Sequence, residues 1–129
     1  MQRISTGSPF ETTFGYSRAV RHEDTIYVSG TTGYDYATMT MPDSVEEQAR
    51  NCLATIARAL EEGGFSPADV VRAHYYVTDR AFVPRVYPIL GEVFGEIRPA
   101  ATMIVCGLAE PEMKVEIEVT ALRRSASAT

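Results

Sequence analysis

The sequence predicts an α+β fold in which two helices cover one face of a β-sheet. Three observations predict it: strand-like runs alternate with only two helical patterns, the 129 residues suit one hydrophobic core, and 45% of them are hydrophobic. The predicted order is two strands, a helix, a strand, a helix and two strands. We therefore expect a single domain over residues 1–129, in which residues 124–129 form a frayed polar tail.

The first two strands form a predicted hairpin. One strand lies around residues 18–22, Glu23 and Asp24 make the turn, and residues 25–29 are β-branched and aromatic. Gly30 is expected to end the second strand. Residues 31–42 show no sustained period and are expected to form an ordered loop.

The clearest helix is expected between Asp43 and Gly63. Asp43 and Glu46 form a capping-box-like start, and Gly63 and Gly64 mark the end. Apolar residues recur on one face of this segment, as in a helix packed on a sheet. They are Val45, Ala49, Cys52, Leu53, Ile56, Ala57 and Leu60.

The second half of the chain predicts a strand, a helix and two further strands. The strand over residues 70–78 places Val71, Ala73, Tyr75 and Val77 on one face. The helix is expected at about residues 82–94, where Pro88 would kink it or delay its start. Residues 101–106 form an apolar strand candidate, and residues 114–122 alternate strictly between apolar and polar.

Two helices leave one face of the sheet uncovered. The strands around Ile26 and Ile104 carry apolar residues on both faces, so a monomer would expose a large apolar patch. We therefore expect a homo-oligomer that buries this face.

Several classes of function are disfavoured. The net charge of −5 repels nucleic acid, and no apolar run approaches the roughly 20 residues of a membrane helix. Cys52 and Cys106 lie in apolar runs and are expected to be inert core thiols of a cytoplasmic protein, although a Cys–His nucleophilic pair stays open. Together with His22 and His74 they show no metal-ligand spacing, so we expect no metal and no cofactor.

Glu116 and Glu118 lie two residues apart in the last strand and therefore share a face. That face is either a solvated polar surface, which is ordinary for a strand buried on one side, or a functional site. A carboxylate at a subunit boundary could position or deprotonate a water molecule.

Four segments together resemble the Rid family, the reactive intermediate deaminases that are also called the YjgF family. They are residues 26–30 (IYVSG), residues 69–79 (DVVR, then VTD), residues 98–102 (RPAAT) and residues 115–118 (VEIE). The resemblance spans about residues 16–122. It implies a chorismate-mutase-like fold with a mixed sheet, a homotrimer, and ligand clefts between subunits.

The resemblance also implies an activity and a set of site residues. Family members hydrolyse imine or enamine metabolites, of the 2-iminobutanoate and 2-iminopropanoate type, to a 2-oxo acid and ammonia, and a motif arginine holds the substrate carboxylate. Here the matching position is Ala101, and Arg98 is either a substitute or a simple loop charge. Glu116 matches the carboxylate that orients water, and Met103 stands where many members have cysteine.

Three more positions match the ligand cleft of the family, namely Tyr16, Ser29 and Gly30. For Tyr16 the alternative is an aromatic residue packed at the trimer interface, and for Ser29 a hydroxyl on an edge strand. The favoured hypothesis is a Rid-like hydrolase or deaminase with an altered specificity. The alternatives are a non-catalytic metabolite-binding trimer and, less favoured, an endoribonuclease or translation inhibitor, which would require a basic aromatic surface.

Overall fold

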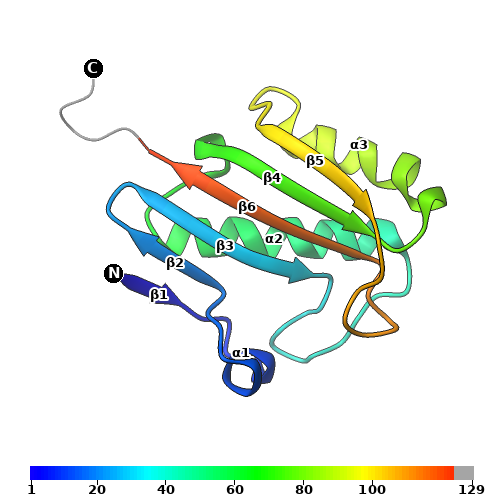
Figure 1. The fold of residues 1–129 in the computed structure, drawn as a ribbon, viewed down its shortest axis with the longest axis horizontal. Helices are drawn as coiled ribbons and strands as arrows, with labels where there is room; N and C mark the ends of the chain where they lie inside the picture. Colours follow the sequence, from blue (N-terminus) through cyan, green and yellow to red (C-terminus); the bar gives the residue numbers. More distant parts are fainter. Residues whose placement is uncertain (124–129) are drawn as a thin grey trace.

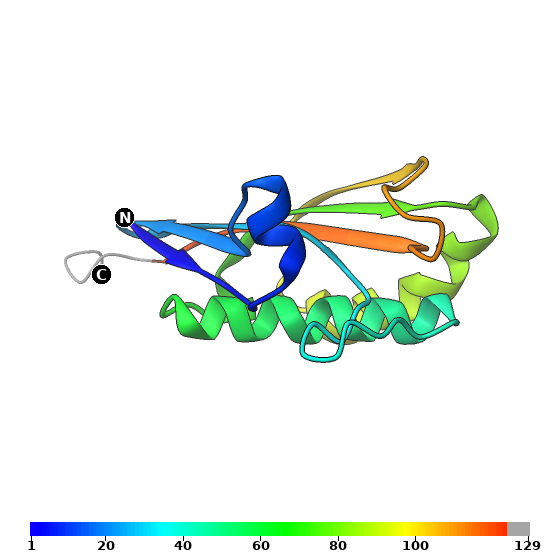
Figure 2. The same ribbon diagram turned by 90° about the horizontal axis from the view of Figure 1, so that it is seen from below.

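The computed structural model describes residues 1–123, in which helices α2 and α3 pack on one face of a six-stranded sheet (Figures 1 and 2). This confirms the predicted α+β class, while the tail predicted at residues 124–129 lies outside the described residues. The strands are β1 (Gln2–Ile4), β2 (Ala19–His22), β3 (Thr25–Thr32), β4 (Val70–Val77), β5 (Ala100–Val105) and β6 (Val115–Leu122). The helices are α1 (Pro9–Phe14), α2 (Val45–Glu62) and α3 (Val83–Phe94), and short 3₁₀ turns cover Pro67–Asp69 and Arg80–Phe82.

The sheet is mixed, with the strand order β1-β2-β3-β6-β4-β5. Only β4 and β5 pair in parallel among the described strands, because α3 carries the chain back across the sheet between them. The last strand in the sequence, β6, therefore lies in the middle of the sheet between β3 and β4 (Figure 1).

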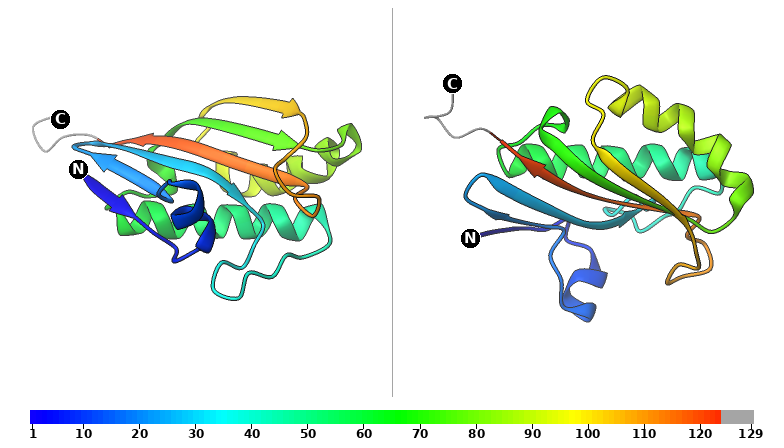
Figure 3. Two further views of the ribbon diagram at one scale, coloured as in Figure 1. Left: turned by 60° about the horizontal axis from the view of Figure 1, so that its bottom comes forward. Right: turned by 45° about the horizontal axis from the view of Figure 1, so that its top comes forward.

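The strict alternation of β6 places Val115, Ile117, Val119 and Ala121 in the core beneath α2 and α3. Its polar residues alternate with these and therefore face the side of the sheet that the helices leave open. Figure 3 shows the sheet and the helices from two further directions. Apolar residues are also exposed within this single chain, among them Tyr27 (56% exposed), Ile104 (42%) and Leu122 (48%). Residues 1–123 contain no helix long and apolar enough to cross a membrane.

The N-cap of helix α2 lies one residue later than predicted. Ser44, rather than Asp43, is the N-cap residue, and its hydroxyl accepts a hydrogen bond from the backbone N–H of Glu47 at 3.1 Å. Helix α3 accommodates Pro88 within its length and matches the predicted span to within one residue.

Two β-bulges change the predicted strands. Strand β3 does not end at Gly30 but shifts register between Val28 and Thr31 and continues to Thr32. Strand β4 shifts register between Val70 and Arg72. Val71, which was predicted to share a face with Ala73, is therefore exposed, and Val70 is buried in its place.

Strand β5 is an edge strand and is largely exposed, although its apolar sequence predicts burial. Cys106, which follows it, is half-buried rather than part of the core, whereas Cys52 is buried as predicted. The short β1 and α1 were not predicted. Helix α1 lies at the β2–β3 side of the sheet (Figure 1), where Ser8 caps it, Pro9 begins it and Gly15 ends it with φ of 78°.

Candidate functional site

A cleft of about 480 Å³ lies on the open side of the sheet, between α1, the end of β3, the start of β6 and the loop before β6. Its aromatic and apolar wall comes from α1 and the loops, and its acidic floor comes from β6. The lining residues are Phe10, Phe14, Tyr16, Ser29, Gly30, Thr32, Tyr36, Ala109, Glu110, Met113, Glu116 and Glu118. Four of the residues expected in the site, Tyr16, Ser29, Gly30 and Glu116, are therefore brought together.

The carboxylate of Glu116 lies directly over the Cα atom of Gly30. A Cβ atom added at residue 30 would stand 1.9 Å from Oε2 and 2.9 Å from Cδ of Glu116. Only glycine leaves this space free, since the bulge in β3 brings the backbone under the neighbouring strand β6. Gly30 thus fixes where the carboxylate lies.

Burial raises the pKa of Glu116, and the nearby carboxylate of Glu118 raises it further, while the guanidinium of Arg18 works in the opposite direction. The protonated form of Glu116 is accordingly more populated near neutrality than that of an exposed glutamate. A carboxyl group in this condition can both accept and return a proton.

Arg18 is the polar centre beneath the cleft, and it is fully buried. Its Nη1 donates to the carbonyl of Gly30 at 2.7 Å and to the hydroxyl of Thr31 at 2.8 Å, and its Nη2 donates to the hydroxyl of Tyr16 at 3.2 Å. The guanidinium also lies 5.4 Å from the ring of Tyr16 and 5.0 Å from the ring of Tyr36. Arg18 therefore holds two parts of the cleft wall in place.

The hydroxyl of Ser29 donates to the carbonyl of Ser17 at 2.6 Å, so its proton ties β3 to the chain entering β2. This bond agrees with the structural alternative for Ser29, although the residue also lines the cleft. Burial raises the pKa of Tyr16, which is therefore a neutral hydrogen-bonding group.

Glu118 belongs to a polar cluster on the open face. The hydroxyl of Tyr76 donates to Glu118 Oε1, and His74 Nδ1 lies 3.5 Å from the same oxygen. The hydrogen bond to Glu118 is the main reason that the pKa of Tyr76 rises to about 12. Glu116 and Glu118 thus share a face, as predicted, but have different partners.

Ala101, Met103 and Arg98 do not line this cleft within one chain. Ala101 lies on the outer strand β5, which β6 and β4 separate from β3; it pairs with Ala73 of β4 and is exposed. Met103 packs against the core on the helical side, so its side chain has a packing role here. Arg98 is exposed in the turn between α3 and β5, with φ of 55°.

Sequence reasoning missed Arg18 and the aromatic wall formed by Phe10, Phe14 and Tyr36. A signal for Phe10 and Phe14 was available, because Ser8, Pro9 and Glu11 form a helix-start pattern. Arg18 offered no comparable signal, since its partners lie 12 and 13 residues further along the chain. Residues 1–123 contain no group of three His, Cys, Asp or Glu side chains that could bind a metal ion.

The fold and the cleft define the class of the protein, which is an α+β domain with two helices on one face of its sheet and an acidic cleft on the other. Comparison with known proteins identifies the family. The family model described as Endoribonuclease L-PSP matches residues 6–123, so the chain belongs to that family. An uncharacterized protein of Streptomyces coelicolor is 30% identical over 124 residues, which cover 95% of this chain and 92% of that protein.

Two solved structures connect the family to the resemblance seen in the sequence. A Mycobacterium tuberculosis member of the YjgF/YER057c/UK114 family is 40% identical with a TM-score of 0.86, covering 95% of this chain and 98% of that one. RidA from an Antarctic Psychrobacter is 27% identical, also with a TM-score of 0.86, covering 95% of this chain and 100% of that one. The predicted membership of the YjgF and Rid family is thereby confirmed.

Proposed function

We propose that the chain hydrolyses an imine or enamine-type metabolite in this cleft, as a Rid-like deaminase whose substrate specificity is altered by Ala101. The observation that carries the proposal is the position of Glu116, whose carboxylate lies over Gly30 with a pKa raised by burial. Water adds through its oxygen to the imine carbon and the C–N bond then breaks, so that an imine and water give a carbonyl compound and ammonia. Glu116 relays both protons of the water to the nitrogen, one as the water oxygen adds to the imine carbon and one from the resulting hydroxyl as the C–N bond breaks.

The proposal includes a homotrimer whose clefts lie between subunits. Its support is the open sheet face, where Tyr27, Ile104 and Leu122 are exposed in the single chain. A neighbouring copy packed there would cover these side chains and exclude water from the open side of the cleft. Light scattering in dilute buffer tests this part, and a stable monomer would contradict it.

The altered specificity follows from the charges around the cleft. In the proposed homotrimer Ala101 of a neighbouring copy faces the cleft, and it has no donor for a substrate carboxylate. Both Nη atoms of Arg18 are already engaged by protein acceptors. Glu110 and Glu118 add negative charge to the lining, beside the apolar side chain of Met113. These features favour a neutral imine over a 2-imino acid.

Ammonia release tests the proposal. The substrates are freshly generated 2-aminoacrylate and an imine without a carboxylate, formed in place by oxidation of a primary amine. We expect the wild type to act on the neutral imine, Ala101→Arg to gain activity on 2-aminoacrylate, and Glu116→Gln to lose about 10²-fold or more in rate. Glu96→Gln, at an exposed position outside the cleft, is the matched control. Absence of any rate above buffer for the wild type and Ala101→Arg would overturn the proposal.

A non-catalytic metabolite-binding trimer is the second candidate, and Ala101 is the observation that favours it. A thermal-shift screen against 2-oxo acids and neutral metabolites separates the two, since stabilisation without turnover indicates binding alone. Endoribonuclease activity, which the family description names, fits poorly with a net charge of −5 and three glutamates in the cleft. Salt-sensitive RNA retention in a filter-binding assay would revive it.

A further inference from the structure

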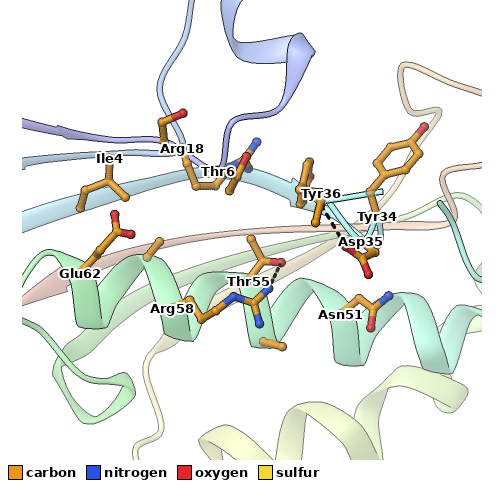
Figure 4. Close-up of a pocket in the computed structure, with 14 residues that line it drawn as sticks. Ile4, Thr6, Arg18, Tyr34, Asp35, Tyr36, Asn51, Thr55, Arg58 and Glu62 are labelled. Atoms are coloured by element: carbon orange, nitrogen blue, oxygen red, sulfur yellow. Dashed lines mark hydrogen bonds between the residues drawn. The ribbon is translucent and has the colours of Figure 1, made fainter. Parts of the chain in front are cut away.

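A second cavity, of about 560 Å³, has Arg18 in its lining. It opens between α2 and the segment around Tyr36, with the start of the chain above it (Figure 4). Its lining is mostly polar or charged, and Tyr36 lines both cavities. Arg18 lines the second cavity and donates to the carbonyl of Gly30 and the hydroxyl of Tyr16, two residues of the cleft lining. These two side chains, Arg18 and Tyr36, therefore form the wall of the second cavity that contacts the lining of the cleft.

The unusual feature of this wall is the Nε atom of Arg18. It is the one buried side-chain nitrogen or oxygen in residues 1–123 that has no hydrogen-bond partner, although Arg18 is fully buried. No acidic side chain among these residues lies within ion-pair distance of Arg18 either. A buried cation with an unmet donor is costly, so an acceptor supplied from the cavity would be strongly favoured.

A second cation stands at the same cavity. Arg58 projects from α2 and donates from Nη2 to the hydroxyl of Thr55 at 3.3 Å, as the dashed line in Figure 4 shows. Within residues 1–123 it forms no ion pair, so most of its donors are open to a ligand. Asp35 and Glu62, both exposed, also line the cavity and oppose a multiply charged anion.

We propose that this cavity binds a small monocarboxylate, which accepts a hydrogen bond from Arg18 Nε and is attracted by Arg58. The occupant also influences the cleft, because the same guanidinium donates to the carbonyl of Gly30 and to the hydroxyl of Tyr16. The proposal does not depend on the reaction proposed for the cleft, since it concerns a different cavity.

Nuclear magnetic resonance titration tests the proposal on the intact, ¹⁵N-labelled protein. The probes are acetate and butanoate, with acetamide and butanamide as uncharged controls of similar shape. We expect the Arg18 Nε–H resonance to shift saturably in the millimolar range with the carboxylates and not with the amides. The backbone amide resonance of Gly30 should follow the same saturation curve.

Three variants locate the binding. Arg58→Gln should weaken it about tenfold, as expected for the loss of one charge-assisted contact. Ala37→Trp fills the cavity from an exposed lining position and should abolish the shift, while Thr38→Trp, at the exposed neighbour outside the lining, should not. Absence of a saturable shift, equal shifts with the amides, or shifts unaffected by Arg58→Gln and Ala37→Trp would each overturn the site. A saturating Arg18 signal with a static Gly30 signal would overturn the link to the cleft.

Discussion

Replacing Gly30 by alanine should displace the Glu116 carboxylate with little change to the rest of the fold. The added Cβ would lie 1.9 Å from Oε2, while ordinary contact begins near 3.4 Å, so Oε2 must retreat by about 1.5 Å. The backbone itself can accept alanine, because Gly30 does not have a positive φ. The perturbation is therefore confined to one side chain.

The expected magnitudes differ between stability and activity. Moving one glutamate off its preferred rotamer costs about 1 kcal/mol. For a chain of this size that cost lowers Tm by about 4 °C. A displacement of this size at a reacting group reduces catalysis by about 10²-fold. Gly91→Ala is the matched control, because nothing lies within 4 Å of its added Cβ, and helix α3 should gain stability from it.

Thermal unfolding and the ammonia-release assay, run on single and double variants, provide the test. In a Glu116→Ala background the clash is gone, so adding Gly30→Ala should cost almost nothing. An equal loss of stability in both backgrounds would show that the carboxylate is not what the new Cβ meets. Activity of Gly30→Ala within twofold of wild type would refute the position assigned to Glu116.

Three further predictions concern charge and reactivity. Burial raises the pKa of Glu116, so its contribution to stability is full below its unfolded pKa and is lost as pH rises through the folded value. In urea titrations the free energy of unfolding of Glu116→Gln, taken relative to that of the wild type, should therefore be higher at about pH 8 than at about pH 4. An equal difference at both pH values would contradict this. Arg18→Lys loses the guanidinium that donates to three acceptors, so chemical denaturation should show a loss of about 2–4 kcal/mol in the free energy of unfolding. The control Arg58→Lys, at an exposed position, should stay within about 0.5 kcal/mol of the wild type. Similar losses for the two variants would refute the role given to Arg18. Iodoacetamide mapped by mass spectrometry should label half-buried Cys106 well before Cys52, whose pKa is raised by burial, and equal labelling would contradict the assigned burial.

The sequence predicted those elements whose pattern is long and regular. Helix α2 and strand β6 each carry an uninterrupted amphipathic repeat that determines which face is buried. Strand β1 and helix α1 were missed because they have three and six residues, too few for a repeat to stand out. Short elements depend on the partners they pack against, and those partners are distant in sequence.

Bulges explain the errors inside the strands. One additional residue in β4 reverses the alternation at its start, which is why Val71 is exposed although the pattern predicts it buried. The bulge in β3 likewise let the strand continue beyond Gly30. A hydrophobic pattern does not reveal an additional residue, because the bulge is seen only against the partner strand.

The candidate site was predicted through the resemblance to the Rid family and not through local patterns. That route brought Tyr16, Ser29 and Glu116 to one cleft. It did not indicate Arg18, which in the sequence is one polar residue in a short strand. Its importance comes from complete burial and from bonds to segments that fold around it.

The central place of β6 has a consequence for how the protein is made. Among the described strands this one is synthesised last, yet it joins the β1–β2–β3 unit to the β4–β5 unit. A nascent chain that still holds residues 115–122 in the ribosome has two half-sheets with unpaired inner edges, and neither Glu116 nor the floor of the cleft exists yet. The cleft is thus assembled only after residues 115–122 have left the ribosome, and until then the unpaired edges of β3 and β4 are open to pairing with other chains.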